Sequence, residues 1–314
     1  MLENAIIVDS ITREYGSVAV VDNLSFKVKK GTIHGFLGPN GAGKTTTMKI
    51  IAGVLPATSG EVQVLGKNVQ QNLKSVKRNL GVLLENPPLY KDMEVKEYLE
   101  FVARLHHVPN AKVNEYVDTA INKLNLESVR DRLIGNLSKG FKQRVGVAQA
   151  VVHKPEIVIL DEPTVGLDPN AVIEMRDLIT NLKENHTVLL SSHLLHEVGL
   201  ICDDVTIIAK GKLQITGAMK DIAENIIEQD IIHLKVKRHN ENFMSSLKEN
   251  DFVQKVEFSI ADDQTSYEIK IESNEDKREF ISKMAFDFDL GLLEMTQEKF
   301  SLEKIFLKVT GELK

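Results

Sequence analysis

A glycine-rich stretch followed by a lysine and a hydroxyl residue is the strongest chemical signal in this sequence. It reads Gly38-Pro39-Asn40-Gly41-Ala42-Gly43-Lys44-Thr45-Thr46. Successive backbone N–H groups of such a loop can face a polyphosphate, and a following helix adds its positive amino-terminal end. Lys44 supplies a charge for the β- and γ-phosphates, and the Thr45 hydroxyl can bind Mg²⁺. The stretch therefore predicts a nucleoside triphosphate site.

The alternative is an ordinary glycine turn beside an exposed lysine. The neighbouring residues favour the phosphate site, because the apolar run 33–37 predicts a strand and residues 44–52 are helix formers without proline. A strand, a glycine loop and a helix in that order form the context that this motif requires.

Two acids end a second apolar run, at Asp161 and Glu162 after residues 157–160. A buried strand of a parallel sheet would carry both carboxylates to the sheet edge where ligands bind. Asp161 would then hold Mg²⁺ through water, and Glu162 would orient or deprotonate the attacking water. Alone, an Asp-Glu pair before Pro163 is as well explained as a turn or a helix cap.

A third motif, Leu137-Ser138-Lys139-Gly140-Phe141-Lys142-Gln143-Arg144, predicts the start of a helix with Ser138 as its N-cap. A serine beside a glycine at such a position can also bind phosphate. The cap alone is the simpler explanation. The phosphate-binding interpretation is favoured once this motif is taken with the glycine loop, the Asp-Glu pair and Ser191-Ser192-His193 after a later strand.

With these motifs in order, residues 4–225 resemble the nucleotide-binding subunits of ATP-binding cassette (ABC) transporters. Further matching features are Tyr15 at the adenine-stacking position, an equivalent of the Q-loop, and Gly166-Leu167-Asp168-Pro169 in the D-loop. The resemblance implies that two copies close head to tail around two ATP-Mg²⁺. Each ATP would lie between the glycine loop of one copy and Ser138, Lys139 and Gly140 of the other.

The resemblance also implies roles for residues that their spacing alone leaves open. His193 would contact the γ-phosphate, Asp168 would lie across the dimer, and Val20 would belong to the nucleotide pocket. Glu85 stands where the family has a Q-loop glutamine, so its carboxylate would contact Mg²⁺ or the water.

Two further departures concern the dimer contacts. Lys139 replaces a glycine of the family's signature and places a cation at a helix amino terminus, which is unfavourable unless an anion faces it. We therefore expect Lys139 to help ATP close the dimer. Val165 replaces a residue of the D-loop that is often polar, which weakens any expected contact there.

Glu85, the Lys139 signature and residues 301–307 resemble the ABC-2 group of exporter ATPases. That resemblance implies separate permease subunits, with a docking surface near residues 85–90, where Leu89 and Tyr90 are apolar. The alternative for these two side chains is packing within the helical block.

The hydrophobic pattern predicts an α/β fold around these motifs. Short strands open the chain as an antiparallel edge, at 5–9, 15–21 and 24–28, and alternating strands and helices from 156 to 209 predict a buried parallel core sheet. Residues 95–152 have helical spacing. We expect an ABC ATPase domain over 1–225, with a helical subdomain at about 86–152.

The tail predicts a smaller α+β domain over 226–314. Its order of strand, helix, strand, strand, helix and strand is ferredoxin-like, and a last helix would carry Leu302, Ile305, Phe306 and Val309 on one face. His233 falls on the polar face of its strand. The tail could serve as a dimerisation or regulatory domain, or as a solvated lid that stabilises the cassette.

Composition narrows the classes of function. The chain has 314 residues, 42% hydrophobic and 27% charged, with one cysteine, Cys202, so neither disorder nor a disulfide framework is expected. Lys plus Arg equals Asp plus Glu up to residue 227, and the net charge of −6 lies entirely beyond it. Since no basic stripe is present, nucleic acid is not an expected partner.

No apolar run approaches the ~20 residues of a membrane span. We expect the chain at the cytoplasmic face of the membrane, held there by a permease. The alternative is a soluble ABC ATPase of translation or DNA repair, but such proteins tend to carry two cassettes, coiled-coil arms or zinc modules. A nucleotide switch without turnover is disfavoured by Glu162.

Overall fold

The computed structural model describes residues 3–85, 87–222, 230–261, 264–272 and 275–298. The described chain divides into two compact units, one up to Met219 and one from Lys220 onward. The expected boundary at residues 225 and 226, the expected last helix, and residues 301–307 lie outside the described residues.

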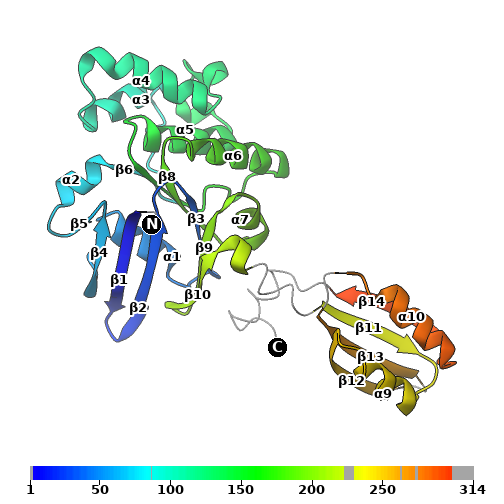
Figure 1. Cartoon of the computed structure of the whole chain (residues 1–314). Helices are drawn as coiled ribbons and strands as arrows, with labels where there is room; N and C mark the ends of the chain where they lie inside the picture. The colour runs from blue at the N-terminus through cyan, green and yellow to red at the C-terminus, as the bar shows by residue number, and fades with distance from the viewer. Residues whose placement is uncertain (1–2, 86, 223–229, 262–263, 273–274, 299–314) are drawn as a thin grey trace. The chain divides into compact units, whose positions relative to one another are not determined.

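A six-stranded sheet forms the centre of the first unit, in the order β10-β9-β3-β8-β7-β6 (Figure 1). The pairs among β3, β6, β7, β8 and β9 are parallel, and β10 joins β9 antiparallel. The strands are β3 (Ile33–Leu37), β6 (Leu80–Leu83), β7 (Ile157–Asp161), β8 (Thr187–Ser192), β9 (Asp204–Ala209) and β10 (Lys212–Ala218). The sheet is therefore mixed, where the sequence predicted a parallel one.

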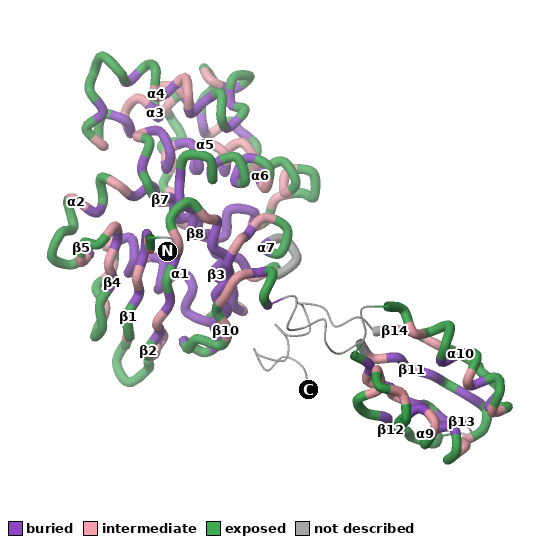
Figure 2. The backbone as a smooth tube through the Cα atoms, viewed as in Figure 1, coloured by how far each residue is buried: buried purple, intermediate pink, exposed green. Residues whose placement is uncertain are grey.

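A second sheet is antiparallel, in the order β2-β1-β4-β5. Its strands are β1 (Asn4–Tyr15), β2 (Val18–Lys29), β4 (Ser59–Val64) and β5 (Lys67–Asn68). The expected strands at 15–21 and 24–28 were wrong, because β2 is one continuous strand that a turn at Gly16 joins to β1. Helix α1 (Lys44–Ile51) shares one hydrophobic core with both sheets, in which Met48 and Ile51 are fully buried (Figure 2).

The expected helical block is present in the described chain. It contains α3 (Val95–Leu105), α4 (Asn110–Lys123), α5 (Lys139–Val151) and two short 3₁₀ turns, Glu127–Val129 and Ile134–Asn136. Helix α2 (Leu73–Arg78) precedes β6. Helix α5 contacts β6 and β7, and so connects the block to the central sheet.

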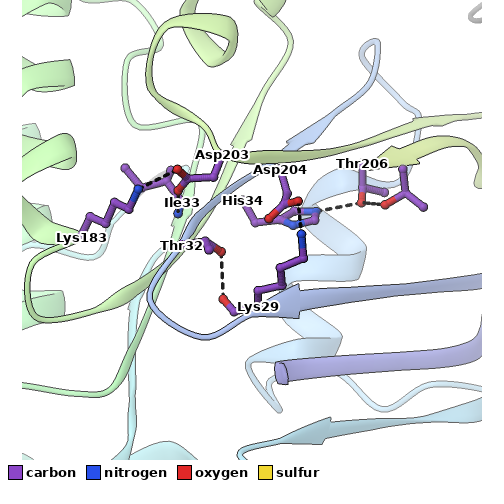
Figure 3. A network of polar contacts seen from close by, with 9 residues as sticks. Lys29, Thr32, Ile33, His34, Lys183, Asp203, Asp204 and Thr206 are labelled. Carbon is purple, nitrogen blue, oxygen red and sulfur yellow. Dashed lines mark hydrogen bonds and ion pairs between the residues drawn. The ribbon is translucent and has the colours of Figure 1, made fainter. Parts of the chain in front are cut away.

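Helix α7 (Leu195–Ile201) packs against β3 and β8 of the central sheet, and α6 (Pro169–Leu182) packs against α7. Polar contacts hold the amino end of β3 in place (Figure 3). Asp203 accepts from the Ile33 N–H at 2.9 Å, and Lys29 pairs with Asp204 at 2.7 Å. These contacts lie at the end of β3 opposite to the glycine-rich loop. Among the described residues, no helix has the length and apolar character needed to cross a bilayer.

The second unit is a four-stranded antiparallel sheet in the order β12-β13-β11-β14. Its elements in chain order are β11 (Asp230–Val236), α9 (Glu241–Lys248), β12 (Val253–Ala261), β13 (Gln264–Ile271), α10 (Arg278–Asp287) and β14 (Leu292–Glu298). Its core contains Phe243 and Leu247 of α9, Ile281 of α10 and alternate strand residues.

Candidate functional site

The carboxyl ends of β3, β7 and β8 lie side by side. Asp161 at the end of β7 is the register partner of Ser191 on β8, and Leu37 at the end of β3 is the partner of Ser192. Parallel pairing therefore brings the residues after all three strands to one edge of the sheet, although they come from distant parts of the sequence.

The glycine-rich loop leads from β3 into α1, with Asn40 and Gly41 exposed at its turn. Gly43 is the N-cap of α1 at φ 102°, and a Cβ there would lie 2.7 Å from the Val20 carbonyl oxygen. No side chain caps this helix, and its first turn has no acid. The amino terminus of α1 is thus available to an anion.

Lys44 is buried in the first turn of α1, and its ammonium makes three contacts within the site. It donates to the carbonyls of Gly38 at 2.7 Å and Pro39 at 3.3 Å, and its Nζ lies 3.2 Å from Oε1 of Glu162. The lysine is therefore held at the mouth of the loop.

Glu162 is contacted from two sides. Its Oε1 faces Lys44, and its Oε2 lies 2.9 Å from Nδ1 of His193. Its backbone is left-handed, at φ 51°, a conformation that only a few per cent of non-glycine residues adopt. The N–H of Glu162 donates to Oγ of Ser191 at 2.9 Å, which fixes the turn after β7.

Asp161 is fully buried, and one of its carboxylate oxygens has a hydrogen bond. Ser191 donates to Oδ1 at 2.6 Å, while Oδ2 is buried without a hydrogen-bond partner. A buried, unpartnered carboxylate oxygen is costly. The arrangement fits a divalent cation nearby, since oxygen ligands and a carboxylate are what Mg²⁺ prefers.

A cavity of about 350 Å³ unites these groups. Its lining comprises Val20, Asn40, Gly41, Gly43, Lys44, Thr45, Thr46, Glu85, Glu162, Val165 and His193. The structure thus brings together the glycine loop, the Q-loop acid, and the residues after β7 and β8. Gly38, Pro39 and Ala42 form the remaining backbone of the loop.

The other predicted site residues do not line this cavity. Tyr15 is 49% exposed, and the Arg13 guanidinium lies 4.7 Å from its ring centroid. Ser138, Lys139, Gly140 and Asp168 belong to a separate surface, where α5 and α6 begin.

Two helices start at this second surface with capped amino termini. Ser138 Oγ accepts from the Phe141 N–H at 3.3 Å, and Asp168 Oδ1 accepts from the Ala171 N–H at 3.0 Å. A Cβ on Gly166, which has φ 67°, would lie 2.0 Å from Nζ of Lys139. The lysine amine of the signature therefore lies directly over the D-loop glycine of its own chain.

Ser191 is a residue whose role the sequence did not reveal. It was noted only as part of a Ser-Ser-His motif, yet its hydroxyl bonds both Asp161 and the N–H of Glu162. A serine near the end of a fully buried strand is the signal that could have identified it, because a buried hydroxyl needs partners.

The fold and the site together define the class. The ABC transporter family model matches residues 21–165. The chain belongs to the ATP-binding proteins of ABC transporters, and it is an ATPase subunit of that kind.

Particular relatives match over almost their full length. The chain is 35% identical to the bacitracin transport ATP-binding protein BcrA of Bacillus licheniformis, covering 96% of this chain and 95% of that protein. It is 30% identical to the linearmycin resistance ATP-binding protein LnrL of Bacillus subtilis (strain 168), covering 96% and 97%. Among solved structures, cbiO1 from Clostridium perfringens, part of the ABC transporter complex cbiONQ, matches with a TM-score of 0.64 and 26% identity, over 70% of this chain and 90% of that one.

Proposed function

We propose that this protein powers an exporter, and that two copies close head to tail around two ATP molecules during each cycle. The observation that carries the proposal is the separation of two phosphate-binding features within one chain. The glycine loop, Glu162 and His193 share one cavity, while Ser138, Lys139 and Gly140 lie outside it. A second copy supplies the missing half of each site.

Within each site, Glu162 acts as the general base. Its carboxylate lies at the cavity wall, and His193 orients it through the 2.9 Å contact. Deprotonation of the attacking water by a positioned carboxylate contributes about 10²- to 10⁴-fold to such reactions. Lys44 and the amino terminus of α1 bind the β- and γ-phosphates, and His193 also contacts the γ-phosphate.

Thr45, Asp161 and Glu85 would hold Mg²⁺. The unpartnered Oδ2 of Asp161 supports this, as does the position of Thr45 and Glu85 on the cavity wall. When bound, the cation neutralises charge that develops on the phosphate oxygens. Glu85 brings a negative charge where the family has an amide, so it favours the cation over direct contact with phosphate.

The remaining predicted residues act around the nucleotide. Tyr15 stacks on the adenine and Val20 contacts the nucleoside. Asp168 lies across the dimer interface. The exposure of Tyr15 supports its role, since half of a large ring is open to a ligand.

A permease is the proposed partner, and the chain lies with it at the cytoplasmic face of the membrane. Two near full-length relatives are named for bacitracin transport and linearmycin resistance, which favours export over a soluble role in translation or DNA repair. The docking surface includes Leu89 and Tyr90. Tyr90 packs against the rings of Tyr98 and Phe101 and is still 50% exposed, so part of it remains open to a partner.

The domain organisation is part of the proposal. Residues 1–225 form the ATPase domain, with the helical subdomain at about 86–152, and residues 226–314 form an accessory domain. We propose that the accessory domain is ferredoxin-like, which the order of its elements and the strand order β12-β13-β11-β14 support.

The test is Glu162→Gln, which removes the base but keeps the shape. We expect ATP turnover to fall at least about 100-fold while ATP still binds, and an ATP-bound dimer to accumulate in sedimentation experiments. Glu156→Gln is the matched control, because Glu156 precedes the same strand at its opposite end and forms a surface ion pair with Lys30. Turnover retained in Glu162→Gln would disprove the assignment of the base.

A further inference from the structure

The sheet of the second unit has one face that no described element covers. Helices α9 and α10 pack on the other face, through alternate strand residues such as Leu234 and Ile269 (Figures 1 and 2). The uncovered face, here called the open face, carries the strand residues that alternate with these buried ones. It includes a shallow hollow of about 430 Å³, lined in part by His233, Ser266 and Glu294.

On β12 and β13, the charges of the open face lie in rows that run across the two strands. Lys255 on β12 is the register partner of Lys270 on β13. Two residues along, Glu257 is the partner of Glu268. A row of lysines therefore lies beside a row of glutamates.

The two directly opposed pairs of this arrangement are unfavourable within one sheet. Like charges directly opposite each other on neighbouring strands destabilise an antiparallel pair. Exchanging the two residues on one strand would make both cross-strand pairs attractive. The Lys255–Glu257 ion pair at 2.5 Å along β12 offsets this repulsion, and so does the diagonal attraction of Lys255 to Glu268 and of Glu257 to Lys270. The influence of the ion pair is visible in the pKa of Glu257, which the hydrogen bond and charge of Lys255 lower.

The same arrangement is complementary to its own copy. A two-fold axis parallel to the rows, passing between them, places the lysine row of one copy over the glutamate row of the other. Lys255 then faces Glu257 of the second copy, and Lys270 faces Glu268 of the second copy, with both pairs repeated by symmetry. Such an isologous contact joins the two copies through the same surface.

From this complementarity we infer that the open face is a homodimer interface, on which a second copy of this chain packs sheet against sheet. The contact is small and polar. Four strands about 4.8 Å apart and roughly seven residues long make a face of about 400 Å², below the roughly 800 Å² per partner of standard interfaces. It is therefore weak alone.

Weak contacts become effective when a second interaction joins the same two molecules, because the effective concentration then reaches about the millimolar range. The inference in this respect rests on the proposed function, in which two cassettes close around ATP. The open face would keep the two copies together while the ATP sites are empty, and so speed each new closure.

Charge reversal in the full chain tests the interface. We expect Lys255→Glu/Lys270→Glu and Glu257→Lys/Glu268→Lys each to weaken nucleotide-free dimerisation at least about tenfold in analytical ultracentrifugation. The variant with all four changes should return to within about threefold of wild type. Mixing the two double variants should give a heterodimer at least about tenfold tighter than either homodimer.

The matched control is Lys248→Glu/Lys283→Glu, which makes the same change in net charge on the helical side. Both lysines are exposed on α9 and α10, so this variant should dimerise as wild type does. The mixing experiment also shows that both double variants are folded, since complementary partners must recognise each other. A four-residue variant that stays weak, or double variants that associate normally, would overturn the inference.

The ATP-dependent dimer is measured separately, in a Glu162→Gln background with ATP. Suppose that this ATP-dependent dimer forms, but the dissociation constant of the nucleotide-free dimer is the same in the charge variants as in wild type. The inference then fails and the proposed function stands. If the charge variants change nucleotide-free dimerisation as expected but ATP does not strengthen dimerisation, the proposed function fails instead.

Discussion

The ammonium of Lys44 lies 3.2 Å from the carboxylate of Glu162, and both side chains are only 7% exposed. The cation proposed to bind phosphate thus neutralises the carboxylate proposed to activate water. A γ-phosphate arriving at the loop competes for Lys44 and releases Glu162 for its role. Binding of the substrate and availability of the base are therefore coupled through one buried ion pair. The base becomes available only when the substrate is bound.

This coupling predicts opposite effects on ATP affinity from the two partners. Lys44→Ala removes the phosphate ligand and should weaken ATP binding at least about 100-fold, as expected for a buried, hydrogen-bonded charge. Glu162→Gln removes the competitor and should strengthen binding about threefold or more. Titration calorimetry on both variants measures these constants. Equal affinities in Glu162→Gln and wild type would show that the ion pair does not restrain Lys44.

Substitution of Ser191 should impair catalysis rather than ATP binding. Ser191→Ala removes the hydrogen bonds to Asp161 and to the N–H of Glu162, so both carboxylates lose their positioning. We expect kcat to fall about tenfold or more with KM changed less than about threefold. Ser191→Thr, which keeps a hydroxyl, should recover much of the rate. A selective rise in KM with normal kcat would contradict the positioning role.

Local motifs explain why much of the site could be predicted from the sequence. The glycine loop is defined by consecutive residues, and its strand and helix follow from apolar runs on either side of Gly38 and Thr45. The N-cap role of Ser138 was predicted in the same way and is confirmed by its hydrogen bond to Phe141. Short-range chemistry decides these features, and the sequence displays it directly.

Contacts set by strand register were not predictable. The contact between Lys44 and Glu162 depends on which strands lie beside β3, and that order follows from packing over the whole sheet. The position of the Lys139 side chain over Gly166 likewise depends on how α5 packs beside the D-loop. Neither relationship has a signature in any short stretch of sequence.

Lys139 predicts a charge effect on closure of the dimer. Its cation lies at the amino terminus of α5, which has no acid in its first turn, so an anion is needed to offset the repulsion. Lys139→Gly should weaken ATP-dependent dimerisation about threefold to tenfold, and more at low salt. Lys112→Gly, in the first turn of α4, is the matched control. An unchanged dimer constant in Lys139→Gly would exclude contact with the opposing phosphate.

A side chain at Gly81 should destabilise the junction of β6 and α5. A Cβ on Gly81 would lie 1.8 Å from the Ala150 carbonyl oxygen, so the helix backbone would have to move. Gly81→Ala should lower the free energy of unfolding by about 2 kcal/mol or more, as overpacking does in rigid cores. Gly140→Ala is the contrast, because its nearest atom is 3.7 Å away and no shift is needed. Denaturant unfolding of both variants measures the difference. Similar denaturation midpoints would show that α5 shifts to accommodate the added Cβ without loss of stability.

His34 predicts a pH dependence of stability. Its ring is buried at β3, where Nε2 contacts the Thr206 hydroxyl at 2.8 Å (Figure 3). Burial lowers the pKa of His34 to about 4, with Lys29 lowering it further and Asp204 opposing the shift. Between pH 6.5 and 4 the unfolded chain therefore binds a proton that the folded chain does not, so stability falls as the pH falls through this window.

His34→Gln keeps a hydrogen-bonding group but removes the titration. The slope of stability against pH should then decrease between pH 6.5 and 4, by up to about 1.4 kcal/mol per pH unit. His153 contributes a dependence of the same sign, because burial also lowers its pKa to about 4, so some slope should remain. Urea unfolding at several pH values measures the slope, with His107→Asn at an exposed position as the control. If His34→Gln loses stability on acidification as steeply as wild type does, protonation of His34 does not contribute to the pH dependence of the free energy of unfolding.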